Sequence, residues 1–210
     1  YVAAMNTNGT KLHKILTISD DKLKRMAYLG LDIDSGNPET YELIRKSKMS
    51  VSPFERVKET AKELGHRGIP LDIKALLMPE NTSQIEINSI FEYARDVKAR
   101  SVHLRPVVLN GNSFIMNSEV AARIKTASEF YGIKSDISLG RYDERQYKRC
   151  HQMFLFPSFC ADGNIYLCCE YKGREDTKLG SWTDDDFRDI WCSDKHKEIY
   201  NNFLNQQESF

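Results

Sequence analysis

The chain has 210 residues, of which 40% are hydrophobic and 29% are charged. This composition is that of a folded protein with one large or two small cores, and it excludes disordered and collagen-like chains. Thirty basic residues balance thirty acidic ones, so net charge favours neither a nucleic-acid partner nor an anionic membrane surface. No apolar run approaches the roughly 18 residues that a membrane-spanning helix needs.

Segments typical of strands and helices alternate along the first two thirds of the chain. Short apolar runs predict strands at residues 1–5, 31–34, 71–78, 102–108 and 133–139. Apolar residues at helical spacing predict helices between them, at residues 19–29 with Gly30 as the end, 38–49, 54–64, 85–97 and 118–131. Strands and helices that alternate about every 30 residues indicate βαβ units, so we expect an α/β fold with a parallel sheet or barrel.

Polar residues gather where these strands end, at residues 6–9, 34–37, 74–81 and 103–106. The working residues of parallel α/β folds lie at the carboxyl ends of the strands, so these ends are candidate sites. Simple turns remain an equal alternative for residues 7–9 and 34–37, because Asn-Gly and Ser-Gly-Asn-Pro are turn sequences. Arg105 suits a ligand carboxylate, and a salt bridge is its alternative.

The sequence pattern changes after Arg141, and we place a domain boundary near this residue. Two short apolar runs, at 154–159 and 165–169, flank Asp162-Gly163, which predicts a β-hairpin. Helices are predicted at 184–191 and 195–203.

All five cysteines lie between Cys150 and Cys192. The odd number, the lack of a secretory signal and a cysteine-free body favour reduced thiols in a cytoplasmic protein over a disulfide framework. Cys150 is followed by twelve residues, Gly163, four residues and Cys168, which differs from the paired C-x2-C of zinc fingers. Thiolates of a hairpin and a nearby loop can converge on one soft metal centre.

Cys150-x12-Gly163-x4-Cys168 resembles the opening of the SPASM or Twitch domain, the auxiliary iron-sulfur domain of radical S-adenosylmethionine (radical SAM) enzymes. The following segments are similar to that family in order and spacing: Asp162-Gly163-Asn164-Ile165-Tyr166, Leu179-Gly180-Ser181 and Phe187-Arg188-Asp189-Ile190-Trp191. In the first half, residues 7–9, 31–41 and 103–107 resemble the family's third, fourth and sixth barrel strands.

The resemblance implies a partial (β/α)6 barrel over residues 1–140 and a small α+β iron-sulfur domain over residues 141–210. It implies an auxiliary 4Fe-4S cluster, and S-adenosylmethionine with a catalytic 4Fe-4S cluster in the intact parent protein. The metal ligands implied are Cys150, Cys168 and Cys192, with Cys169 or Cys160 as the fourth. Adjacent strand residues point to opposite faces, so we do not expect Cys168 and Cys169 to share one cluster, and Cys160 has a small buried hydrophobe as its alternative. The cofactor-binding residues implied are Asn8, Asp34, Ser35, Asn37 and Arg105.

The activity implied is reductive cleavage of S-adenosylmethionine and radical hydrogen abstraction from a peptide or carbohydrate-type substrate, giving an oxidation or peptide maturation. Flavodoxin or ferredoxin is the electron donor expected for such a protein. The C-x3-C-x2-C motif and the Gly-Gly-Glu segment of the family are absent from these residues, so we expect a fragment that begins near the third strand and is inactive alone. No catalytic residue is assigned. A zinc-stabilised or cluster-free degenerate barrel that acts as a binding module remains the alternative.

Overall fold

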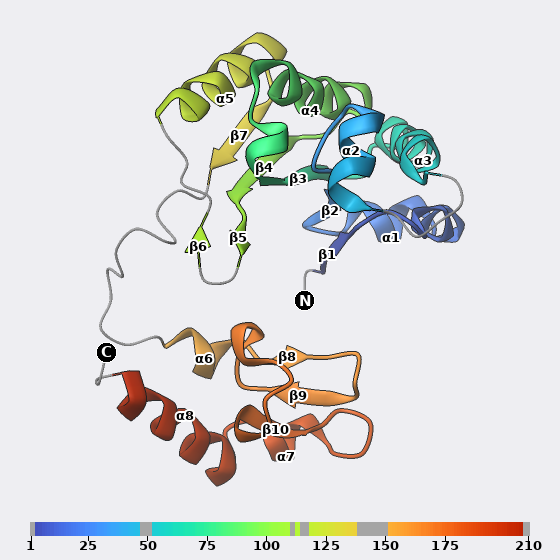
Figure 1. Ribbon diagram of the computed structural model, residues 1–210. Coiled ribbons are helices and arrows are strands. Elements are labelled where there is room, and N and C mark those ends of the chain that lie inside the picture. The colour runs from blue at the N-terminus through green and yellow to red at the C-terminus, as the bar shows by residue number, and fades with distance from the viewer. Residues whose placement is uncertain (1–2, 47–51, 110–111, 114–117, 138–150, 208–210) are drawn as a thin grey trace. The chain divides into compact units, whose positions relative to one another are not determined.

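A computed structural model describes residues 3–46, 52–109, 112–113, 118–137 and 151–207 (Figure 1). The chain divides into two compact units, Tyr1–Asp143 and Glu144–Phe210, and each is described by itself. The predicted boundary near residue 141 lies outside the described residues. None of the helices in the described part of the chain is long and apolar enough to span a membrane.

The first unit is built on a parallel sheet. Within the described residues the sheet has five strands, in the order β1 (Ala4–Thr7), β2 (Tyr28–Asp32), β3 (Leu71–Leu77), β4 (Ser101–Pro106) and β7 (Lys134–Ile137). Each neighbouring pair of strands is parallel. The connecting helices are α1 (Asp20–Lys24), α2 (Pro38–Arg45), α3 (Phe54–His66), α4 (Gln84–Asp96) and α5 (Ser118–Tyr131), with 3-10 turns η1 (Leu12–Thr17) and η2 (Pro79–Asn81). The expected α/β fold is therefore confirmed, and a short antiparallel pair, β5 (Val108–Leu109) with β6 (Asn112–Ser113), is added to it.

The hydrophobic core of this unit lies between the helices and one face of the sheet. Ile73 and Leu77 of β3 are fully buried there with Leu64 of α3 and Phe91 of α4. Removing one such large side chain costs about 2–5 kcal/mol of unfolding free energy. Parallel sheets that are covered on both faces have continuous apolar strands, whereas β4 alternates polar with apolar residues, and the polar ones are its less buried members. The other face of this sheet is therefore a polar surface.

Two sequence predictions at the start of the unit are wrong in detail. The predicted helix at 19–29 ends at Lys24, and Gly30 lies inside β2 instead of ending a helix. A Cβ atom on Gly30 would lie 2.8 Å from Lys74 Cε and would also meet Asn6 Oδ1, so glycine lets these two side chains meet across β2. The first strand is Ala4–Thr7, which brings Asn6 into the sheet instead of a turn.

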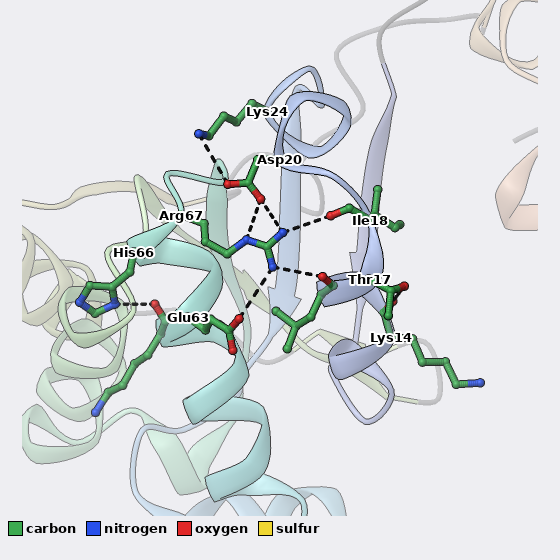
Figure 2. A network of polar contacts seen from close by, with 10 residues as sticks. Lys14, Thr17, Ile18, Asp20, Lys24, Glu63, His66 and Arg67 are labelled. Atoms are coloured by element: carbon green, nitrogen blue, oxygen red, sulfur yellow. Dashed lines mark hydrogen bonds and ion pairs between the residues drawn. The ribbon is translucent and has the colours of Figure 1, made fainter.

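Arg67, the residue after α3, ties this helix to the chain between η1 and α1 (Figure 2). Its guanidinium donates to Asp20 Oδ1 through Nε at 2.7 Å and Nη2 at 2.5 Å. It also donates to the carbonyl oxygens of Leu16 and Ile18, at 3.3 and 3.1 Å. The donors of Arg67 are therefore used within the fold, which makes this network a structural one.

The second unit has a small antiparallel sheet. In the described residues its order is β10 (Lys178–Ser181), β9 (Asn164–Tyr166) and β8 (Ser158–Phe159). The helices are α6 (Gln152–Leu155), α7 (Phe187–Ile190) and α8 (Asp194–Gln207), with 3-10 turns η3 (Cys169–Tyr171) and η4 (Glu175–Thr177). We call the core of this unit the small core; its buried residues are Met153, Ile165, Leu167, Leu179, Ile190 and Phe203.

The predicted hairpin of the second unit is present but shorter than expected. Phe154 and Leu155 belong to α6 instead of a strand, and this helix buries Met153 in the small core while Leu155 is exposed. The turn is made by Asp162, which accepts hydrogen bonds from Asn164 N and Tyr166 Oη, and by Gly163 with φ of +84°. These bonds lower the pKa of the Asp162 carboxyl, the Tyr166 hydroxyl having the larger effect.

Candidate functional site

A cavity of about 330 Å³ lies on the polar face of the parallel sheet, toward the carboxyl ends of β1 to β4. Its volume is near the lower end of the range for small-molecule sites. Within the described part of the chain its lining residues are Asn6, Asp32, Asp34, Arg45, Lys74, Ala75, Leu76, His103 and Arg105. Of the predicted cofactor-binding residues, the structure thus places Asp34 and Arg105 at the cavity.

The register of the strands assembles this lining. Asp32 pairs with Lys74, and Lys74 pairs with His103 on the next strand. Leu76 likewise pairs with Arg105. Because side chains alternate between faces along a strand, the charged members of adjacent strands meet on the face opposite the helices.

Two lining residues, Asp34 and Arg45, form an ion pair with each other. Arg45 Nε is 2.7 Å from Asp34 Oδ2, and the other carboxylate oxygen of Asp34 accepts a hydrogen bond from Leu76 N at 2.9 Å. Arg45 also donates to the carbonyl oxygen of Asp32 at 2.8 Å. The carboxylate of Asp34 is therefore already engaged by the protein, and the pair forms a wall of the cavity.

Three lining residues, Asp32, Lys74 and Arg105, take part in no ion pair among the described residues. Within the described residues, neither Asp32 nor Arg105 makes an ion pair or a hydrogen bond through its side chain, and Lys74 Nζ lies 4.6 Å from the centre of the Tyr28 ring. Burial raises the pKa of the Asp32 carboxyl, an effect that Arg45 and Lys74 oppose and Asp34 adds to. One carboxylate and two cations in one small cavity suit a ligand that carries both signs of charge.

Asn8, Ser35 and Asn37 make hydrogen bonds within the fold and are not among the lining residues. Asn8 Oδ1 accepts from Thr10 N and Thr10 Oγ1, at 3.1 and 3.0 Å. Ser35 Oγ donates to Glu86 Oε2 at 2.6 Å, and Asn37 Oδ1 accepts from Glu39 N at 2.9 Å as the N-cap of α2. Their contribution to cofactor binding stays a prediction.

Asn81 holds the loop that carries Asp34. It is fully buried, and its Nδ2 donates to the carbonyl oxygens of Asp34 and Leu76, each at 2.7 Å. Its Oδ1 accepts from Met78 N at 2.9 Å. The sequence placed Asn81 in the candidate strand end at residues 74–81 but did not predict this role, because one partner lies in the loop after β2 and the other on β3.

Four of the five cysteines lie in the described part of the second unit, and Cys150 is outside the described residues. Cys168 packs against the core, whereas Cys169 is exposed at the start of η3 and Cys160 is half-buried. Cys192 follows α7, is exposed and has φ of +64°. Thiolates are the donors that iron-sulfur clusters take, but among the described residues no group of three or more His, Cys, Asp or Glu could hold a metal ion. Within the described residues, the predicted ligands Cys168, Cys192 and Cys160 or Cys169 are thus not gathered into one group, and Cys150 lies outside these residues, so the ligand set stays a prediction.

His196 fixes the backbone at Cys192. Its Nδ1 accepts a hydrogen bond from Cys192 N at 3.0 Å. The imidazole is fully buried, with ring centres 4.6 Å from Phe154 and 4.2 Å from Trp191. Burial lowers the pKa of His196, so the ring is a neutral acceptor that fixes the main chain beside the thiol.

Comparison with known proteins adds two findings. Residues 150–209 match the family model of the SPASM iron-sulfur cluster-binding domain. Over 99% of the chain, the fold is similar to that of Streptococcus suis SuiB bound to S-adenosylmethionine, with a TM-score of 0.63 and 14% sequence identity, covering 49% of SuiB. SuiB bound to its precursor peptide SuiA gives a TM-score of 0.61 at 12% identity, with 99% of this chain and 49% of SuiB covered. The chain thus spans about half the length of SuiB. No curated protein sequence matches it.

Proposed function

We propose that this chain, which matches the SPASM iron-sulfur domain at residues 150–209 and has the fold of radical SAM enzymes, is part of such an enzyme with a peptide substrate. The match at residues 150–209 carries the assignment. The cavity on the polar face supports it, because it presents unneutralised charges where parallel α/β proteins bind ligands. The substrate and the reaction belong to the proposal.

S-adenosylmethionine carries a carboxylate, an ammonium group and ribose hydroxyls, and the cavity offers a partner for each kind. Arg105, exposed and unpaired within the described residues, suits the carboxylate through two parallel hydrogen bonds. Asp32 suits a hydroxyl or ammonium group, and it replaces Asp34 in this role because Asp34 is held by Arg45. The chemistry supplied by S-adenosylmethionine beside a 4Fe-4S cluster is radical hydrogen abstraction from the substrate.

The protein's own contribution is to place and shield the ligand. The Arg45–Asp34 wall and buried Asn81 hold the ends of β2 and β3 in register, so the charged side chains keep their spacing when a ligand binds. Lys74, resting on the Tyr28 ring, is available to a second anionic group. A peptide is the substrate class we favour, since SuiB binds the precursor peptide SuiA.

For the second unit we propose one auxiliary 4Fe-4S cluster. Its ligands would be Cys150, Cys168 and Cys192, with Cys169 or Cys160 as the fourth. The half-buried position of Cys168 against the small core supports this set, since a cluster needs a partly dry surrounding. We further propose that the intact enzyme is cytoplasmic and receives electrons from a flavodoxin or ferredoxin.

Anaerobic reconstitution of the 210-residue chain with iron and sulfide tests the proposed cluster. Metal analysis and Mössbauer spectroscopy should show a 4Fe-4S cluster that Cys168→Ala loses and the matched variant Cys160→Ala retains. Equal loss from both variants would overturn the order of the ligands. Stoichiometric zinc in a colourless protein would instead support the zinc-stabilised binding module.

A further inference from the structure

Two side chains from different strands meet above Gly30 on the polar face of the parallel sheet. Gly30 of β2 pairs with Asn6 of β1, and the Lys74 side chain reaches over it from β3. A Cβ atom on Gly30 would lie 2.8 Å from Lys74 Cε and 3.2 Å from Lys74 Cδ, and it would also meet Asn6 Oδ1. Asn6 and Lys74 both line the cavity. An amide and an ammonium group are thus held next to each other at the cavity wall.

The backbone of Gly30 does not itself require glycine. Among the described residues, the glycines with positive φ do not include Gly30, and strand β2 continues through it. Glycine inside a strand often marks a place where a ligand or another part of the chain approaches closely. A side chain here would occupy the space of the Asn6 amide and of the Lys74 stem. We therefore attribute Gly30 to the meeting of these two groups.

Both groups have hydrogen-bond donors that the fold does not use. Within the described part of the chain, neither Asn6 nor Lys74 makes a hydrogen bond or an ion pair through its side chain. Lys74 Nζ lies 4.6 Å from the centre of the Tyr28 ring, which takes up one side of the ammonium group. An ammonium group has three N–H donors and a carboxamide has two, so donors remain for a ligand. Asn6 is exposed and Lys74 is half-buried, so a ligand in the cavity reaches both.

The Lys74 side chain runs away from Arg105, the other cation without an ion pair in the described lining. It passes back over Gly30 to the ring of Tyr28, at the start of β2. Arg105 lies toward the end of β4, and its register partner on β3 is four residues beyond that of Gly30. Four residues span about 13 Å along a strand. Arg105 and the pair of Asn6 with Lys74 are therefore separate attachment points for anionic groups.

The charges of the cavity leave Lys74 for a second ligand. In the proposed function, Arg105 takes the carboxylate of S-adenosylmethionine, and Asp32 takes a hydroxyl or ammonium group of the same molecule. Asp34 is already paired with Arg45. Lys74 then has no anionic partner within the described residues. An anionic group on the substrate gains a charge-assisted hydrogen bond at this position.

Resting on the proposed function, we propose that Asn6 and Lys74, brought together at Gly30, bind a carboxylate of the peptide substrate. We call these three residues the carboxylate cradle. Asn6 and Lys74 are then specificity-determining residues, because they hold the peptide by an acidic side chain or by its C-terminal carboxylate. A carboxylate has two acceptor oxygens, one for the ammonium group and one for the amide N–H. No covalent bond forms or breaks in this step.

Three tripeptides test the cradle on the 210-residue chain saturated with S-adenosylmethionine. Acetyl-Gly-Glu-Gly-amide carries a side-chain carboxylate, acetyl-Gly-Gln-Gly-amide is its neutral counterpart, and acetyl-Gly-Gly-Gly with a free carboxylate presents a chain end. NMR titration of the 15N-labelled chain should show a carboxylate bound about tenfold or more tightly than the neutral tripeptide, with shifted side-chain amide signals of Asn6. The tripeptide that is preferred identifies the source of the carboxylate. Equal affinities for all three, or binding of none, would overturn the cradle.

Two variants and a matched control connect this preference to the cradle. Lys74→Gln removes the cation and Asn6→Asp puts a like charge in place of the amide, so each should reduce the tenfold preference to about one. Lys134→Gln removes an exposed lysine of β7 that does not line the cavity, and it should keep the preference. Asn6 is exposed on the outermost described strand, so Asn6→Asp still decides if Lys74→Gln lowers the folded fraction. A full preference in folded Asn6→Asp contradicts the proposal.

Titration of S-adenosylmethionine alone separates this inference from the proposed function. A wild-type chain that does not bind S-adenosylmethionine contradicts the proposed function, and the tripeptides without S-adenosylmethionine then still decide the cradle. A loss of S-adenosylmethionine affinity of about tenfold or more in Lys74→Gln, with an unchanged tripeptide preference, would assign the cradle to the carboxylate of S-adenosylmethionine. That result overturns its assignment to the substrate.

Discussion

Adjacent residues of one strand lie on opposite faces of the parallel sheet, where one packs into the core and the next lines the cavity. On β3, Ile73 is fully buried beneath the helices, whereas Lys74 points to the cavity on the polar face. The same alternation separates Leu104 from His103 on β4. Stability is thus concentrated on one face and unneutralised charge on the other. We therefore expect substitutions at two adjacent strand positions to differ: one should change the stability of the fold, and the other should change the charge of the cavity.

The largest contrast is expected between Ile73→Ala and Lys74→Ala. Ile73→Ala should lower the free energy of unfolding by about 2–5 kcal/mol, because it leaves a void in the core. Lys74→Ala should change it by less than about 1 kcal/mol, since it removes a partly exposed cation that rests on a ring. Urea unfolding followed by circular dichroism measures both. Equal destabilisation by the two variants would break the comparison.

Two glycines sharpen the comparison. A Cβ on Gly36 would overlap the backbone carbonyl oxygen of Ser89, which cannot move away, so Gly36→Ala should cost about 1–3 kcal/mol of unfolding free energy. A Cβ on Gly30 meets the ends of the Asn6 and Lys74 side chains, which can turn aside. Gly30→Ala should therefore cost less in thermal or urea unfolding and mainly disturb the cavity. A larger loss of stability for Gly30→Ala contradicts this account.

The ionised carboxylate of Asp32 on the polar face should lower the free energy of unfolding at neutral pH. Its pKa is raised, chiefly by burial, above the ordinary value of 3.8. A raised folded-state pKa means that stability is present below the unfolded-state pKa and is lost as pH rises through the folded-state pKa. Asp32→Asn, which does not titrate, should therefore be more stable than the wild type at neutral pH, with an advantage that shrinks in acid. Urea unfolding at neutral and mildly acidic pH checks this, and a variant less stable than wild type at neutral pH contradicts it.

The smallest effect is expected at Cys192, away from the sheet. With φ of +64°, Cys192 adopts a conformation that costs little for glycine. Cys192→Gly should raise the unfolding free energy of the metal-free chain by about 0.5 kcal/mol, the relief of strain being partly offset by a more flexible unfolded chain. If Cys192 is a ligand, the same variant should lose iron after reconstitution. A metal-free variant that is less stable than wild type contradicts the strain argument.

Periodicity and turn chemistry predicted most elements of the fold from the sequence. Helices α2 and α5 start where proline or serine predicted them, and the Asp162-Gly163 turn is present. Gly30 was wrongly predicted to end a helix, because the need for glycine at this position comes from the tertiary structure. The side chains of Asn6 on β1 and Lys74 on β3 lie where a Cβ atom would be. Strand β10 was not predicted, because its four residues include a glycine and are too few to show an alternation of apolar and polar side chains.

The candidate site was predictable only in part. The rule that ligands lie at strand ends pointed to Arg105 and Asp34, and both line the cavity. It missed Asp32, because the pairing of Asp34 with Arg45 was invisible in the sequence. The carboxylate cradle likewise depends on the register of β1, β2 and β3, which no local pattern encodes.

Calorimetric titration of S-adenosylmethionine onto the 210-residue chain tests the central claim, that the polar face is the ligand site. We expect saturable binding that Arg105→Ala weakens about tenfold or more, the size of a lost charge-assisted hydrogen bond. The matched control Arg188→Ala removes an arginine whose side chain is 87% exposed in the second unit and should bind as the wild type does. Equal affinities of Arg105→Ala and Arg188→Ala, or no binding by the wild-type chain, would contradict the account.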